Sequence, residues 1–125
     1  MKNLGIKKNL LFQLDMCWQL YLYHTANLEE DEALWAFNSK NLQVRKQDNG
    51  WTVDWPEKES YDMGPSSIGW IMWHMIYWWT TALDYNFGNG ILQREDILWP
   101  GSVKETKAKI QSLHAGENKD TNKYF

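Results

Sequence analysis

The chain has 125 residues, the size of one ordinary domain, and its composition excludes several classes of protein. Lys and Arg number 13 against 16 Asp and Glu, a net charge of −3, and the basic residues form no tract. We therefore expect no nucleic-acid partner, because neutralising phosphates requires a basic stripe. The single cysteine, Cys17, cannot form an internal disulfide and suits a reducing compartment.

The first residues, MKNLGIKKNLLFQLDM, contain lysines but no long apolar core and no small-residue cleavage site. We expect no signal peptide and a cytoplasmic location. The uncharged run from Ile68 to Leu83 is shorter than the roughly 20 apolar residues that a membrane span needs, and it includes His74. No Lys or Arg flanks it as an anchor. The run therefore predicts a buried helix and no membrane association.

A first amphipathic helix of roughly 18–20 residues is predicted near the N-terminus, because apolar residues recur there at steps of three and four. Cys17 belongs to this stripe and has no neighbouring cation in sequence, so we expect an inert core thiol rather than a nucleophile. The stripe consists of Leu10, Leu11, Leu14, Cys17, Trp18, Tyr21 and Leu22.

A short second helix is predicted from Asn27, as N-cap with Glu30 as its capping-box partner, to about Phe37. The acids in LEEDEALW suit a helix start through the helix dipole. Consecutive acids on a helix face different directions, so a solvated helix start is favoured over a metal site.

The middle of the chain predicts a two-stranded hairpin. Apolar residues alternate with polar ones on both sides of Asn49-Gly50, a dipeptide typical of a tight turn. A lone hairpin is marginal, so its tryptophans are expected to pack on the helices. The alternating residues are Leu42, Val44, Trp51, Val53 and Trp55.

A long buried helix is predicted from about Ile68 to Phe87, after the break at Gly64-Pro65 and with Ser66 or Ser67 as its cap. GNG at residues 88–90 ends it.

A more solvated last helix is predicted from Ser102, its cap, to about Leu113. We expect a single helical domain over residues 1–115 and a polar, disordered tail over residues 116–125.

His74 lies on an aromatic stripe of the long helix, since Trp70, Tyr77 and Trp78 are three or four residues away. A buried imidazole must satisfy a ring nitrogen by a hydrogen bond or by a metal. The spacing alone favours a hydrogen-bonded core or pocket histidine over a metal ligand. The tryptophans could also line a pocket for an aromatic ligand, although core packing is the simpler account; they are Trp51, Trp55, Trp70, Trp73, Trp78, Trp79 and Trp99.

The stretch SSIGWIMWHMIYWW, preceded by GWTVDWP, resembles the DinB-like (DNA-damage-inducible) superfamily of bacterial four-helix bundles. The resemblance runs from the first helix to about Leu113. It implies an all-α, up-down bundle with a small β-hairpin insertion, in which a histidine of this helix and a His-x-x-x-His pair on the last helix hold a divalent metal, nickel or zinc. The matching positions are Ser67, Ile68, Gly69, Trp70 and His74.

The sequence departs from that pattern at the metal site. Neither His24 nor His114 has a histidine four residues away, and we expect no fourth helix after Leu113. Only His74 carries over as a metal ligand, whereas a catalytic zinc normally has three protein ligands. A three-helix bundle would leave apolar stripes open to water, so we expect a homodimer, in which His74 could meet His24 or His114 of the second chain.

Two functions follow from these expectations. The leading one, implied by the resemblance, is a metal-dependent transferase or hydrolase of the thiol-dependent transferase type, with an incomplete metal site around His74. The alternative is a non-catalytic, dimeric helical binding module with an aromatic pocket for a small-molecule ligand.

Overall fold

Three long helices and one short helix make up most of the computed structural model, which describes residues 2–56 and 64–124, with side chains from 4–56 and 64–116. The predicted helical bundle with a small hairpin is confirmed. The elements are α1 (Lys2–Thr25), α2 (Glu30–Leu34), β1 (Val44–Gln47), β2 (Gly50–Val53), α3 (Ile68–Phe87), the 3-10 turn η1 (Arg94–Asp96) and α4 (Val103–Tyr124).

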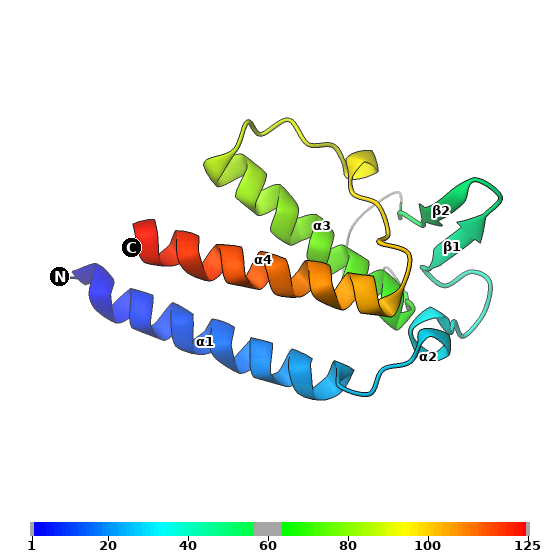
Figure 1. The fold of residues 1–125 in the computed structure, drawn as a ribbon, viewed down its shortest axis with the longest axis horizontal. Coiled ribbons are helices and arrows are strands. Elements are labelled where there is room, and N and C mark those ends of the chain that lie inside the picture. The colour runs from blue at the N-terminus through cyan, green and yellow to red at the C-terminus, as the bar shows by residue number, and fades with distance from the viewer. Residues whose placement is uncertain (1, 57–63, 125) are drawn as a thin grey trace.

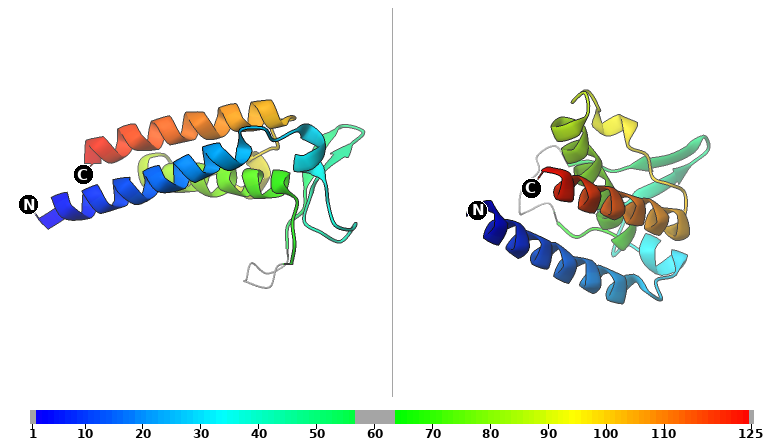
Figure 2. Two further views of the ribbon diagram at one scale, coloured as in Figure 1. Left: turned by 90° about the horizontal axis from the view of Figure 1, so that it is seen from below. Right: turned by 60° about the vertical axis from the view of Figure 1, so that its left-hand side comes forward.

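The long helices lie side by side, and α1 runs antiparallel to α3 and α4 (Figure 1). A crossover over residues 88–102, which contains η1, returns the chain along α3, so α3 and α4 point the same way. The ends of the chain meet at one end of the bundle, and the hairpin lies at the other (Figure 2). None of the described helices combines the length and the apolar character needed to cross a membrane.

The core forms where α3 and α4 face each other. α3 is apolar on nearly every side and buries Trp70, Met72, Trp73 and Ile76. α4 contributes a stripe at steps of three and four, as an amphipathic helix must to bury one face. Its buried members are Val103, Thr106, Ile110 and Leu113.

The hairpin is confirmed, with Val44 opposite Val53 and Lys46 opposite Trp51. Asp48 and Asn49 form its turn, and Gly50 follows with φ +130°, a backbone conformation that other residues rarely adopt. A hydrogen bond of 2.8 Å from Trp70 Nε1 to the Asp54 carbonyl fixes the hairpin against α3.

The predicted boundaries of α3 are confirmed at both ends. Ser67 is the N-cap, and its Oγ accepts the Trp70 N–H at 3.0 Å, while Gly88 is the C-cap. Ser102 likewise caps α4 and accepts the Glu105 N–H at 3.1 Å. These caps are local interactions, which explains why the sequence reveals them.

Three predicted boundaries are wrong. α2 begins one residue after Glu29, which forms the capping box with Glu32, so Asn27 is not the cap. α2 also ends at Leu34 rather than near Phe37. The last helix does not end near Leu113, because α4 continues to Tyr124.

The apolar stripe of α1 is only partly buried. Cys17, expected in the core, is exposed, because α3 and α4 cover a narrower face of α1 than its apolar composition suggests. The residues that turn inward are Leu11, Leu14, Trp18 and Tyr21.

Candidate functional site

His74 lies partly buried in the middle of α3, and its Nε2 accepts a hydrogen bond of 2.9 Å from Trp78 Nε1. The two residues are four apart, so they lie one above the other on the same helical face. Indole is a donor only, so the accepting imidazole nitrogen carries no proton in this arrangement. This bond occupies Nε2, one of the two ring nitrogens through which a histidine can bind a metal.

Aromatic rings surround the imidazole. The Trp70 ring stacks on it at a centroid distance of 4.6 Å and 22°, and Trp55 reaches it from the segment after β2 at 6.2 Å. Tyr77 lies nearly parallel to it at 6.3 Å. These rings supply dispersion and shape, and none of them is an anionic ligand for a cation.

A nickel or zinc site within one chain does not fit the donors around His74. In the part of the chain that the structure describes, no three His, Cys, Asp or Glu side chains gather closely enough to hold a metal ion. His24 lies exposed on α1 with its ring edge against Tyr23, and His114 belongs to another aromatic cluster. The three protein ligands that a catalytic zinc normally has are therefore not found together among the described residues.

His114 joins the long helices to one another. Its ring lies flat on Trp18 of α1, with centroids 3.9 Å apart at 4°, and meets Trp79 of α3 edge-on at 6.2 Å. Burial lowers the pKa of His114, and the Asp15 charge opposes that effect by raising it. No local sequence pattern predicts this contact, because the two ring partners of His114 lie on two other helices, α1 and α3.

A small cavity of about 250 Å³ lies between the hairpin and the crossover. We call it the tryptophan pocket; its aromatic walls are Trp51, Trp73 and Trp99, three of the seven tryptophans considered from sequence. Trp99 Nε1 is buried and has no hydrogen-bond partner among the described residues. Arg94 and Glu95, which sequence reasoning missed, line the same cavity and form an ion pair of 2.9 Å.

The acidic residues of LEEDEALW accept hydrogen bonds from backbone N–H groups at the starts of two helices. Glu32 Oε1 accepts the Glu29 N–H at 3.2 Å, as the second half of the α2 capping box. Glu30 accepts the backbone N–H of Val103 and thereby caps the first turn of α4 from a distant part of the chain. The helix-start interpretation is confirmed, and the second helix that Glu30 serves was not foreseen.

Comparison with known proteins gives one match. A search of the curated proteins and a search of the solved structures found no significant similarity. The family model of the DinB superfamily matches residues 13–116, which include the Ile68-Gly69-Trp70 helix start and His74. The chain therefore belongs to the DinB superfamily.

Proposed function

We propose that this chain is a dimeric helical binding module that takes a small aromatic molecule in the tryptophan pocket. The observation that carries the proposal is a cavity walled by three indoles, one of which, Trp99, has a buried N–H without a hydrogen-bond partner among the described residues. Buried donors are normally satisfied, so a ligand or a water that accepts this hydrogen bond is expected there.

The chemistry of the tryptophan pocket limits the kinds of ligand that it can bind. Indole walls favour a flat aromatic ring, which stacks or packs edge-on against them. The volume of about 250 Å³ lies below the roughly 300–1,000 Å³ typical of ligand sites, so the ligand must be small. The ligand must also carry an acceptor for Trp99 Nε1, because that indole nitrogen can only donate.

A dimer is supported by the outer face of α1. Four exposed apolar residues of α1, from Phe12 to Tyr23, are spaced four, four and three residues apart. They therefore lie on the side of α1 opposite to the side chains that it turns inward. A contiguous apolar face of this kind is typical of an interface. A second copy of the chain is the proposed occupant, since the face carries no charge to recognise a charged partner. We call these residues the α1 outer face: Phe12, Met16, Leu20 and Tyr23, exposed by 64%, 48%, 55% and 79%.

The ligand proposal is tested by titrating the protein with quinoline and with indole, followed by NMR of the backbone amides. Quinoline offers a ring-nitrogen acceptor, whereas indole offers only a donor. Quinoline should bind more tightly, and Trp99→Phe should remove the difference while keeping an aromatic wall. Trp35→Phe, at an exposed position outside the pocket, is the control. Equal binding of both compounds, or unchanged quinoline binding in Trp99→Phe, would contradict the proposal.

A second candidate is the metal-dependent transferase or hydrolase of the thiol-dependent type. It is favoured by one observation, that His74 occupies the histidine position of the helix motif in a chain of this superfamily. Because the donors among the described residues of one chain do not fit, the proposed nickel or zinc site uses His24 or His114 of a second copy beside His74. Metal analysis separates the two candidates.

A further inference from the structure

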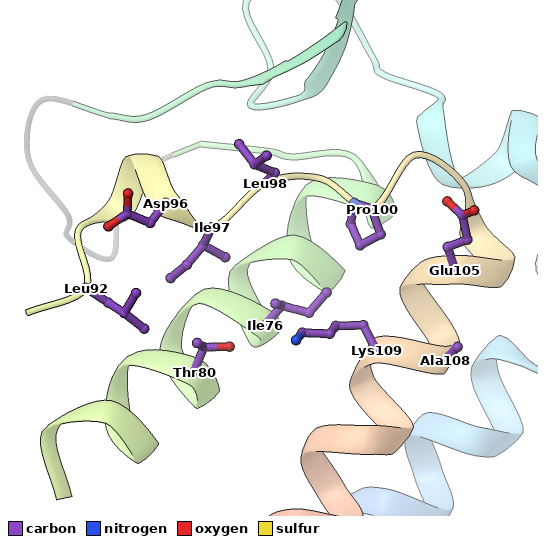
Figure 3. A pocket seen from close by; sticks show the side chains of 10 residues that line it. All are labelled: Ile76, Thr80, Leu92, Asp96, Ile97, Leu98, Pro100, Glu105, Ala108 and Lys109. Atoms are coloured by element: carbon purple, nitrogen blue, oxygen red, sulfur yellow. The ribbon is translucent and has the colours of Figure 1, made fainter. Parts of the chain in front are cut away.

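A second and larger cavity, of about 570 Å³, lies between α3, α4 and the crossover. We call it the crossover pocket (Figure 3). It is separate from the His74 cluster, because Ile76 and Thr80 of its wall lie roughly 200° and 240° around α3 from His74.

The pocket has apolar walls of a size that suits a small molecule. Its volume falls within the roughly 300–1,000 Å³ typical of ligand sites. Ile76 and Ile97 are 2% and 8% exposed and form its floor. The apolar walls are completed by Leu92, Leu98, Pro100 and Ala108.

Two polar groups converge inside these walls. The Thr80 hydroxyl is buried and has no hydrogen-bond partner among the described residues. Lys109 reaches across from α4, and Figure 3 shows its ammonium and the Thr80 hydroxyl pointing toward each other. No salt bridge of the described residues involves Lys109. The buried Thr80 hydroxyl and the ammonium of Lys109, an exposed residue, offer two donors to one anionic group.

The two acids of the pocket do not oppose this pair directly. Asp96 Oδ2 accepts the Gln93 backbone N–H at 2.9 Å and is thereby committed to the turn η1. Glu105 lies at the other end, against Gly101, where an added Cβ would be 3.0 Å from its Oε2. Figure 3 shows both carboxylates turned away from the space between Thr80 and Lys109.

We propose that the crossover pocket binds a small monocarboxylate with an apolar chain. The carboxylate lies between Lys109 Nζ and the Thr80 hydroxyl, and the chain lies along Ile76 and Ile97. Charge-assisted bonds to a carboxylate supply the orientation, and burial of the chain supplies most of the affinity. The proposal does not depend on the tryptophan pocket or on a metal.

Calorimetric titration of the full chain with octanoate, octan-1-ol and octylamine tests it. Octanoate should bind at least about tenfold more tightly than octan-1-ol, since only the acid forms the charge-assisted pair. Octylamine should bind most weakly, because its ammonium meets Lys109. Equal affinity for octanoate and octan-1-ol, or no saturable binding of octanoate, would overturn the proposal.

Variants locate the binding. Lys109→Gln should remove the preference for octanoate, whereas Lys104→Gln, at an exposed position of α4 outside the pocket, should keep it. Thr80→Val should weaken octanoate binding, and Thr80→Ser, which retains the hydroxyl, should preserve it; circular dichroism checks that both fold. Wild-type affinity and preference in Lys109→Gln would place the carboxylate elsewhere and contradict the assignment.

Discussion

The indole N–H of Trp78 donates a hydrogen bond of 2.9 Å to Nε2 of His74, one turn earlier on α3. The bond gives the histidine a structural partner within its own helix. It also makes His74 a hydrogen-bond acceptor within a cluster of aromatic rings.

Replacement of His74 by alanine should lower the free energy of unfolding. Removing the acceptor orphans the Trp78 N–H and leaves Trp70 without its stacked neighbour, a loss of about 1–3 kcal/mol. The loss of unfolding free energy should lie near the lower end of this range, because Trp78 is 48% exposed and water can replace the lost acceptor. Urea denaturation measures the change. His24→Ala, at an exposed position of α1, should shift stability by less than about 0.5 kcal/mol.

Gly69 should not tolerate a side chain. A Cβ at this position would lie 3.1 Å from the Ala33 carbonyl oxygen and 3.4 Å from the Trp99 ring, where α2 and the crossover pack on the start of α3. Gly69→Ala should therefore destabilise the fold by about 1–3 kcal/mol despite its better helix propensity. Gly116→Ala is the matched control on α4, because nothing lies within 4 Å of its Cβ, and it should stabilise by about 0.5–1 kcal/mol. Equal effects in the two variants would show that Gly69 is not a packing contact.

Stability should fall as the solution is acidified below the ordinary His pKa. Because burial lowers the pKa of His114 in the folded chain, the unfolded chain binds the proton more tightly, and folding favours the neutral ring. His114 therefore contributes stability above its unfolded pKa of about 6.5, and this contribution is lost as the pH falls through the lower folded value. The difference in Tm between about pH 8 and about pH 5 should be smaller in His114→Phe than in the wild type. Phenylalanine keeps the stack on Trp18 but does not titrate. An identical difference in both proteins would contradict this role.

The proposed dimer should separate when charge is placed on the α1 outer face. Phe12→Glu and Leu20→Glu would bury a carboxylate in an apolar interface, which is strongly unfavourable without a partner. Light scattering should then give the 14.9 kDa monomer rather than twice that mass. Phe37→Glu changes a still more exposed aromatic residue outside α1 and should leave the dimer intact. A wild-type chain that is monomeric at micromolar concentration would exclude this interface.

The sequence predicts those features whose causes are local. Ser67 and Gly88 mark α3 because a cap is recognised within a few residues, and the alternation around Asn49-Gly50 marks the hairpin for the same reason. The contact of Glu30 with Val103 joins residues far apart in the chain, so no local pattern announces it.

The candidate sites were predictable only in part. The helix motif led to His74, and its aromatic surroundings followed from helical spacing. The acceptor role toward Trp78 depends on side-chain rotamers, which spacing does not fix. Thr80 and Lys109 lie on different helices, so only the packing of α4 beside α3 brings them to one pocket.

Metal analysis of the purified chain most directly tests our proposal that His74 serves as a hydrogen-bond acceptor and not as a metal ligand. The protein should be produced without a histidine tag in medium supplied with nickel and zinc, and compared with His74→Ala by mass spectrometry of the elements. Our account predicts far less than one metal ion per chain, with no difference between the two proteins. About one nickel or zinc ion per chain in the wild type, lost in His74→Ala, would contradict it.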